Sequence, residues 1–250
     1  MVILTSCLNL YEKDENGNRV PHHIGNENGV FDIIKNNVKK CDNFLFVASD
    51  ETNFEMTDMY ASVTFKSFDM SLPFKKYSIL DGRTKSDAKK LVEEADFIYV
   101  CGGHVPTQNK FFQNINLRDI IKNANALILG VSAGSMNSAD VVYCAPELEG
   151  ESIDPNFQRY LKGLGFTNTN IMPHYNDCKD EVLDGKEYMK DIVVPDSFKK
   201  EIVLINDGTF IVCSDNKETV YGEAYILKDG VITQICENDK CVDLVIDDVM

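Results

Sequence analysis

The chain has 250 residues, of which 44% are hydrophobic and 26% are charged. These are ordinary values for a globular protein, and they disfavour intrinsic disorder and a coiled coil. The chain has 25 basic and 40 acidic residues and a net charge of −15, which opposes binding to nucleic-acid phosphates and to anionic membranes. The length admits one large α/β domain or two small ones, and because the sequence has no internal repeat and no Pro/Gly/Ser-rich linker, we expect a single domain over residues 1–250.

The N-terminal residues predict a first β-strand rather than a signal peptide, because they have no basic flank and only a short apolar run. No apolar run approaches the roughly 18 residues that a membrane helix needs. The eight cysteines are scattered without a Cys-x-x-Cys pair, and the only close pair, Cys236 and Cys241, has no histidine near it. We therefore expect a cytoplasmic protein with reduced thiols, no metal and no cofactor.

Apolar runs of strand length recur along the chain, with helical patterns between several of them. These runs are Val2–Thr5, Asn43–Ala48, Tyr77–Leu80, Phe97–Cys101, Ala126–Val131, Asn170–Met172 and Ile202–Ile205. The alternation predicts βαβ units and an α/β fold with a mostly parallel, doubly wound sheet. Residues 126–129 are apolar without a break, which is typical of a strand that is buried on both faces.

Three segments have apolar residues at helical spacing and can cover such a sheet. They carry Phe31, Ile34 and Val38; Met56, Tyr60 and Val63; and Ala88, Leu91, Val92 and Ala95. The polar stretch Glu15–Asn28 between the first strand and the first helix predicts a loop. Near the C-terminus, Thr209–Cys213, Tyr221–Leu227 and Val231–Cys236 predict antiparallel strands, and residues 228–230 fit a hairpin turn between the last two.

The clearest local signal is a Gly-x-Ser-x-Gly sequence at residues 130–134, where a buried strand leads into a predicted helix. Small neighbours allow the tight turn of a nucleophile elbow, which would present Ser132 at the carboxyl edge of the sheet. There the backbone N–H of Ala133 can donate to a developing oxyanion at the positive end of the helix. The alternative is that these residues merely close a strand-to-helix turn.

A serine hydroxyl needs a base to become a good nucleophile, and the chain has four histidines. His22 and His23 lie in the polar early loop, where we expect exposed positions without a catalytic role. His104 and His174 each follow a predicted strand, and ligands of open α/β sheets bind beyond the carboxyl ends of the strands. We predict His174 as the base, since Pro173 fixes its backbone, although a structural role is the alternative.

A carboxylate should orient the imidazole and stabilise its cation. Asp207 is preferred because it follows a predicted strand, as Ser132 and His174 do. Asp154 is the alternative, and it would give the chain order Ser, Asp, His that α/β-hydrolases have. Aspartates beside glycine or proline also commonly serve in turns and helix caps, so either residue can instead have that role.

Two glycines follow the strand that ends at Cys101, and their backbone can approach a substrate closely. The N–H of Gly103 is therefore a candidate for completing an oxyanion hole with Ala133. The alternative is a tight strand-to-helix turn that needs a positive φ.

Four motifs together carry a resemblance: Gly102-Gly103, the 130–134 elbow, Pro173-His174-Tyr175 and Asn206-Asp207-Gly208. Over approximately residues 97–213 the chain resembles the dipeptidase E and cyanophycinase family of serine peptidases. That resemblance implies a flavodoxin-like sheet related to class I glutamine amidotransferases. It also implies Ser132 as nucleophile, His174 as general base and acid, and Asp207, or else Asp154, as the orienting carboxylate.

The chain departs from the family pattern at several positions. Ser135 replaces the usual alanine and adds a second hydroxyl near the elbow, and His104 stands where the family often has asparagine. Together with Asp154, these are candidate substrate-binding residues. Residues 176–181 are mostly acidic where dipeptidase E has arginines, which argues against specificity for aspartyl substrates.

These observations favour a serine hydrolase that cleaves a short peptide or isopeptide through an acyl-enzyme. One alternative is an inactive binding or regulatory relative of amidotransferase domains. Glutamine amidotransfer ranks lowest, because that chemistry uses a cysteine at the elbow and Ser132 occupies the position. A small peptide is the expected partner, and the sequence defines neither its side chains nor the oligomeric state.

Overall fold

The computed structural model of the chain describes residues 1–214 and 217–244. Within these residues the largest sheet has eight strands in the order β18-β15-β14-β1-β7-β6-β4-β5. The strands are β1 (Val2–Thr5), β4 (Asn43–Val47), β5 (Lys76–Leu80), β6 (Phe97–Val100), β7 (Leu127–Val131), β14 (Phe210–Ser214), β15 (Lys217–Tyr221) and β18 (Cys241–Asp243). The five from β1 to β5 in this order are parallel, and the other three are antiparallel. The expected α/β fold with a mostly parallel sheet is confirmed.

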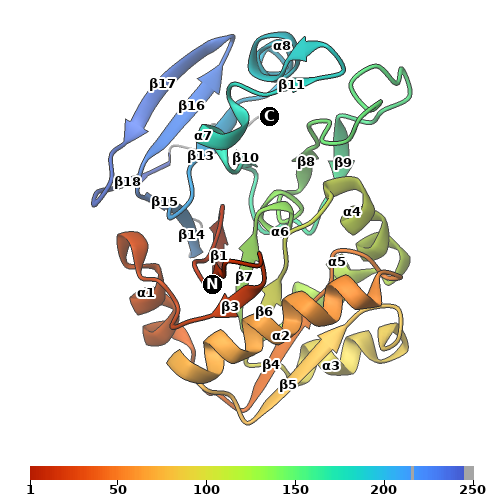
Figure 1. Cartoon of the computed structure of the whole chain (residues 1–250), viewed down its shortest axis with the longest axis vertical. Helices are drawn as coiled ribbons and strands as arrows, with labels where there is room; N and C mark the ends of the chain where they lie inside the picture. Colours follow the sequence, from red (N-terminus) through yellow and green to blue (C-terminus); the bar gives the residue numbers. More distant parts are fainter. Residues whose placement is uncertain (215–216, 245–250) are drawn as a thin grey trace.

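Helices cover both faces of this sheet, which is why every residue of β1, β6 and β7 is buried. Side chains of α1 and α2 pack on one face, and those of α3, α4 and α5 pack on the other (Figure 1). The helices are α1 (Val30–Asn37), α2 (Phe54–Ser71), α3 (Ala88–Glu94), α4 (Val105–Asn114), α5 (Leu117–Ile121), α6 (Ala133–Met136), α7 (Tyr175–Cys178) and α8 (Val194–Asp196). Two 3-10 turns, η1 (Glu27–Gly29) and η2 (Lys85–Asp87), and a π-helix, η3 (Tyr188–Val193), complete the set in the described part of the chain.

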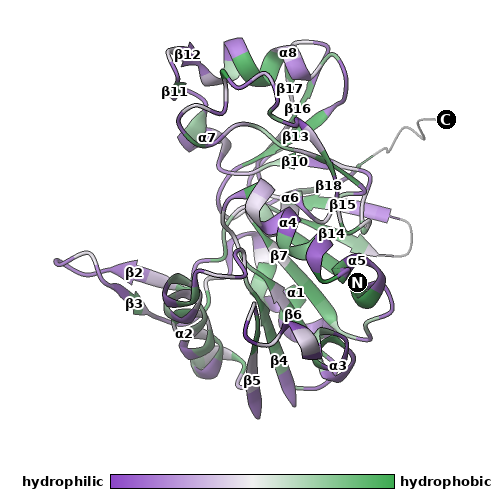
Figure 2. Ribbon diagram, turned by 90° about the vertical axis from the view of Figure 1, so that its right-hand side faces the viewer, coloured by the Kyte–Doolittle hydropathy of each residue, from purple (hydrophilic) through white to green (hydrophobic). Residues whose placement is uncertain are grey.

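A second sheet of four strands has the order β10-β13-β16-β17. Its strands are β10 (Asn170–Met172), β13 (Ile202–Ile205), β16 (Ala224–Lys228) and β17 (Val231–Cys236). β10 and β13 are parallel, and β16 and β17 are antiparallel to their neighbours. Figure 2 shows this sheet above the large one, and the two share a hydrophobic core to which Leu4 and Ile211 contribute from below and Ile171 and Val203 from above.

Two predictions about local structure are wrong. The stretch Glu15–Asn28 is not simply a loop, because β3 (Arg19–Pro21) pairs with β2 (Tyr11–Lys13) in a hairpin that projects from the molecule (Figure 2). The Asp14 carboxylate forms the hairpin turn by accepting the N–H groups of Asn16 and Asn18.

The predicted strand Tyr221–Leu227 is likewise two strands in different sheets. Tyr221 ends β15 and Ala224 begins β16. Gly222 between them has φ +97°, a conformation that favours glycine, so the chain can turn from one sheet into the other.

Two further antiparallel strand pairs were not predicted. β8 (Val141–Tyr143) pairs with β9 (Tyr160–Lys162), and β11 (Val182–Leu183) pairs with β12 (Lys186–Glu187). Each strand has only two or three residues, too few to show a periodic pattern. In the described residues, no helix combines the length and the apolar character needed to span a membrane.

Candidate active site

Ser132 stands in the sharp turn between β7 and α6, with φ 50° and ψ −115°. This conformation is strained for a residue other than glycine, and such strain is common at nucleophile elbows. Close packing explains why residues 130 and 134 beside the turn are glycines. A Cβ on Gly134 would lie 2.2 Å from the Val100 carbonyl oxygen, and one on Gly130 would lie 2.9 Å from the Gly134 carbonyl oxygen.

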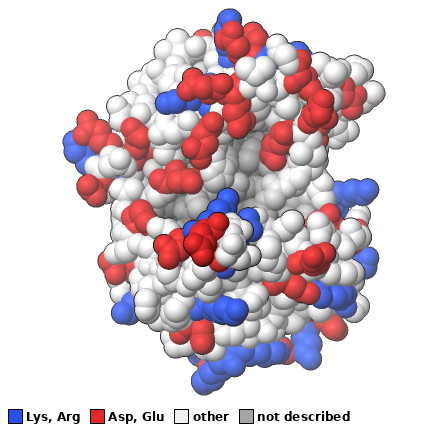
Figure 3. Space-filling view, in the orientation of Figure 1, with Lys and Arg blue, Asp and Glu red and all other residues white. Residues whose placement is uncertain are grey.

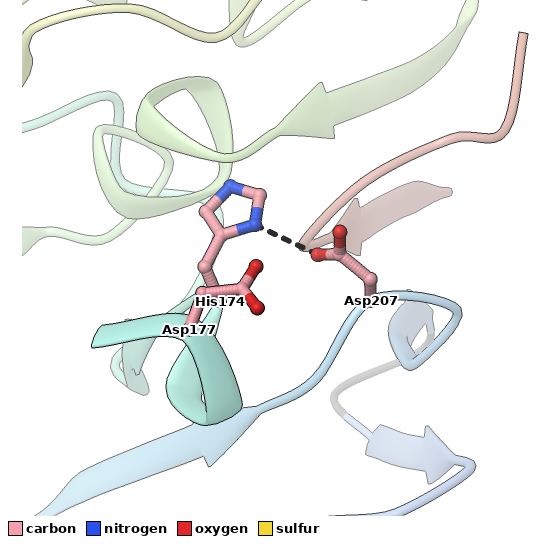
Figure 4. Close-up of side chains that lie close together, drawn as sticks. All are labelled: His174, Asp177 and Asp207. Carbon is pink, nitrogen blue, oxygen red and sulfur yellow. Dashed lines mark hydrogen bonds and ion pairs between the residues drawn. The ribbon is translucent and has the colours of Figure 1, made fainter. Parts of the chain in front are cut away.

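Ser132, His174 and Asp207 form one hydrogen-bonded line. The Ser132 Oγ lies 3.0 Å from His174 Nε2, and His174 Nδ1 lies 2.7 Å from Asp207 Oδ1. All three follow the carboxyl ends of strands: Ser132 follows β7 of the large sheet, and His174 and Asp207 follow the neighbouring parallel strands β10 and β13 of the small one. Figure 4 shows the imidazole reaching from the start of α7 toward Asp207.

Ser6 is a fourth member of this network, and the sequence analysis did not identify it. Its hydroxyl donates to Asp207 Oδ1 at 2.6 Å and accepts the backbone N–H of His174 at 2.9 Å. The side chain is completely buried. A signal existed, because Ser6 directly follows β1, which pairs with β7, and the residues after parallel neighbouring strands meet at one sheet edge.

The charges of the site shift both titratable partners. Burial lowers the pKa of His174, but the hydrogen bond and charge of Asp207, with smaller effects of Asp177 and Glu147, outweigh it and hold the pKa above its ordinary value. The hydrogen bond with His174 lowers the pKa of Asp207, aided by the bond from Ser6 and opposed by burial. The site thus favours an ionised carboxylate beside an imidazole that readily takes up a proton.

Asp177 on α7 lies on another side of the same imidazole (Figure 4). Ligand atoms of His174, Asp177 and Asp207 lie within 4.8 Å of one another, a grouping that can hold a metal ion. Both ring nitrogens of His174 already have partners, Nδ1 with Asp207 and Nε2 with Ser132, so a metal bound to the imidazole would compete with the hydrogen-bonded line.

A cavity of about 200 Å³ opens beside Ser132 and His174. Most of its remaining lining is apolar, and two residues carry carboxylates. The lining comprises Ser132, Met136, Ala145, Glu147, Met172, Pro173, His174, Cys178, Glu181, Val182, Leu183 and Tyr188. Burial, together with repulsion from Glu151, raises the pKa of Glu147 to about 7. The sequence analysis did not identify Glu147, because only the fold brings its segment to the elbow.

The structure places Asp154 and His104 in supporting contacts rather than in the hydrogen-bonded line. The Asp154 carboxylate accepts the backbone N–H of Asn156 at 2.8 Å, a turn contact, so it does not support the alternative triad. His104 lies 2.8 Å from the Thr107 hydroxyl through Nδ1 and 2.9 Å from Glu151 Oε1 through Nε2. Both of its ring nitrogens are therefore occupied.

Gly102 and Gly103 contact different residues. A Cβ on Gly102 would lie 3.2 Å from the Ser132 Cβ, so this residue lies directly against the serine. Gly103 has φ +152°, and a Cβ there would lie 2.4 Å from the Ser49 Cβ. A Cβ would be tightly packed at Gly102 and would clash at Gly103, and the positive φ expected of the turn is present at Gly103.

Ala133 and Ser135 are both buried in α6. The Ser135 hydroxyl contacts the carbonyl oxygens of Thr5 and Gly130, each at 2.8 Å. It links the turn at Ser132 to β1 and is only 1% exposed, so the structure gives no support to the prediction that Ser135 binds substrate.

Comparisons with known proteins identify the fold and the family of the chain. A candidate peptidase E of Listeria monocytogenes EGD-e, known from a crystal structure, matches with a TM-score of 0.53 and 16% identity over 94% of this chain and 96% of that one, which shows a shared fold. No curated protein matches the chain. The model of peptidase family S51 matches residues 18–221. The chain therefore belongs to peptidase family S51, the dipeptidase E family, and is a serine-type peptidase.

Proposed function

We propose that the chain cleaves a short peptide or isopeptide through an acyl-enzyme, with Ser132 as nucleophile, His174 as general base and acid, and Asp207 as the orienting carboxylate. The observation that carries this proposal is the continuous line of hydrogen bonds, 3.0 Å and 2.7 Å long, through the two ring nitrogens of His174. The asymmetry of this line defines the roles, because the imidazole has one side toward the alcohol and the other toward the carboxylate.

In the first step, Ser132 Oγ attacks the substrate carbonyl carbon while its proton passes to His174 Nε2. The tetrahedral intermediate collapses as Nε2 returns that proton to the leaving amine, and the acyl group stays on the serine. Water then attacks the ester with the same base, and the acid product leaves with Ser132 restored. Asp207 stays ionised and stabilises the imidazolium that forms twice in each cycle.

Backbone N–H groups near the elbow are the proposed oxyanion hole. Ala133 is the first residue of α6, and the first N–H groups of a helix have no partner within the helix. Gly103 is proposed as the second donor, which is supported by the close approach of Gly102 to Ser132. Together they would stabilise the negative oxygen of the tetrahedral intermediate.

We also propose that residues 1–250 form one domain in the cytoplasm. Ser6 of the large sheet bonds to His174 and Asp207 of the small one, so the site requires both sheets. All eight cysteines have free thiols, which is usual for proteins of a reducing compartment.

A fluorophosphonate probe tests the proposal directly. We expect it to label Ser132, to fail with Ser132→Ala, and to react far more slowly with His174→Ala and Asp207→Asn. Asp154→Asn is the matched control and should be labelled at the wild-type rate. An unlabelled protein would indicate a binding relative without catalysis, and undiminished labelling of the His174 and Asp207 variants would refute the triad.

A further inference from the structure

The cavity beside Ser132 combines an apolar wall with negative charge. Met136, Met172, Leu183 and Tyr188 supply most of the apolar wall, and Leu183 belongs to the short β11–β12 hairpin. Among the residues that the structure describes, no lysine or arginine lines the cavity. In the space-filling view, acidic side chains lie on several sides of the hollow at the middle of this face, and basic side chains border it from below (Figure 3).

Two carboxylates direct their charge into this cavity. The charge of Glu147 acts on His174, Cys178 and Tyr188, and all three line the cavity. The charge of Glu181 acts on Cys178 and Tyr188 as well. Glu147 and Glu181 therefore line the cavity from two segments of the chain. Glu147 belongs to residues 147–152, and Glu181 directly precedes β11.

Neither carboxylate has a lysine or arginine partner among the described ion pairs, although the backbone N–H of Val105 and the charge of His174 both act on Glu147. A third acid, Glu151, has partners, because it accepts the N–H groups of Glu147 and Leu148 and lies 2.9 Å from His104 Nε2. Arg159 is the basic residue whose charge reaches Tyr188, and its guanidinium lies 3.7 Å from Asp196. No described lysine or arginine therefore neutralises Glu147 or Glu181, and a cationic ligand can pair with them.

The shape of the wall distinguishes a cationic side chain from a free α-ammonium group. A lysine or arginine side chain has an apolar stem that can cover methionine and leucine side chains while its charged end meets a carboxylate. An α-ammonium group has no such stem and would leave the apolar wall in contact with water. A bound cation would also stabilise the ionised form of Glu147, whose pKa is raised to about 7 in the absence of a ligand.

We infer that this cavity binds a lysine or arginine side chain, with its stem along the apolar wall and its cation at Glu147 and Glu181. The inference rests on the proposed function, since it assigns the cavity to the substrate residue whose carbonyl Ser132 attacks. The peptidase would then prefer peptides that donate the acyl group from a basic residue.

The test compares two chromogenic anilides, α-N-acetyl-lysine and α-N-acetyl-norleucine p-nitroanilide, which differ only in the terminal ammonium group. We expect kcat/KM to be at least about tenfold higher for the lysyl substrate, the factor for one charge-assisted hydrogen bond. Glu147→Gln should remove most of this ratio, and Glu181→Gln should reduce it. Using the ratio cancels any effect of Glu147 on His174. Glu149→Gln, which changes an exposed acid outside the cavity lining, should leave the ratio unchanged.

Several results would overturn the inference. One is a ratio near one in a protein that the fluorophosphonate labels. Another is cleavage only of substrates with a free α-amine, with Glu147→Gln affecting lysyl and norleucyl substrates equally, which would assign the acids to the peptide N-terminus. If the probe does not label Ser132, the proposed function fails separately. Calorimetry with α-N-acetyl-lysinamide and α-N-acetyl-norleucinamide then decides, since equal affinities would refute the cationic site.

Discussion

Replacing Ser6 by alanine should impair catalysis, although it leaves the side chains of Ser132 and His174 and the lining of the cavity unchanged. The hydroxyl donates to Asp207 Oδ1 at 2.6 Å and accepts the His174 N–H at 2.9 Å. His174 has φ 56°, a conformation that non-glycine residues seldom adopt, so this backbone contact helps to hold the residue in place. Ser6→Ala therefore loosens both ends of the imidazole–carboxylate pair.

The size of the effect follows from these two bonds. A hydrogen bond to a charged group contributes about 1.5–3 kcal/mol, and an unsatisfied buried N–H costs about 1–3 kcal/mol. We expect the variant to lose roughly 3 kcal/mol of stability, which lowers Tm by about 6–12 °C in a chain of this size. A displacement of the base by about 1 Å can reduce turnover 100-fold. Since Ser6 does not line the cavity, KM should change much less than kcat.

Steady-state kinetics on the lysyl anilide and thermal unfolding by circular dichroism measure the two effects separately. Ser67→Ala is the matched control, because Ser67 is also completely buried and donates to a backbone carbonyl, that of His22, but lies on α2 outside the triad. It should lower Tm modestly and leave kcat unchanged. A Ser6→Ala protein that is destabilised but keeps the wild-type kcat would refute a positioning role.

Three other perturbations have defined outcomes. Because Asp207 holds the pKa of His174 above that of a free histidine and the neutral imidazole is the proposed base, kcat/KM should rise with pH through a midpoint above the pKa of a free histidine, and Asp207→Asn should move that midpoint to lower pH in a pH–rate profile. An unmoved midpoint would contradict the pairing. Gly134→Ala should lower Tm by about 6–12 °C, since overpacking against backbone costs about 3 kcal/mol, whereas Gly17→Ala, with open space around it, should cost about 1 kcal/mol for its positive φ; similar unfolding curves for the two variants would refute the steric argument. Asp184→Ala removes the carboxylate that accepts the N–H groups of residues 150 and 152 and so holds the β11–β12 turn in place. We expect KM to rise several-fold while the rate of fluorophosphonate labelling stays constant. An unchanged KM would show that these hydrogen bonds do not shape the cavity.

The parallel part of the fold was predictable because it is built from long local patterns. The runs at β1, β4, β6 and β7 are nearly continuous in apolar residues, and the structure buries them between helices. The elbow was also predictable, since close packing at Gly130 and Gly134 excludes larger side chains. These features depend on neighbours in the sequence, and a single sequence records them.

The features that the sequence analysis missed depend on contacts between distant segments. Ser6 gains its partners 168 and 201 residues away, so nothing beside it in the chain marks it. Ser135 has the residue type of a binding group, yet the fold turns its hydroxyl to two backbone carbonyls. Glu147 can be recognised as a candidate only once the fold places it in the lining of the cavity, where its pKa is raised to about 7. The choice of Asp207 over Asp154 rested on strand ends, and the 2.7 Å contact with His174 supports the same choice.

The alcohol of Ser132 belongs to one sheet, whereas the imidazole and the carboxylate belong to the other. A small displacement of one sheet relative to the other would break the hydrogen bond between Ser132 Oγ and His174 Nε2. The hydrogen bonds within each sheet would stay intact. We therefore expect urea to abolish activity at concentrations well below those that unfold the backbone. Loss of turnover would then report on the alignment of the two sheets, whereas the circular dichroism signal would report only on whether their secondary structure is still present.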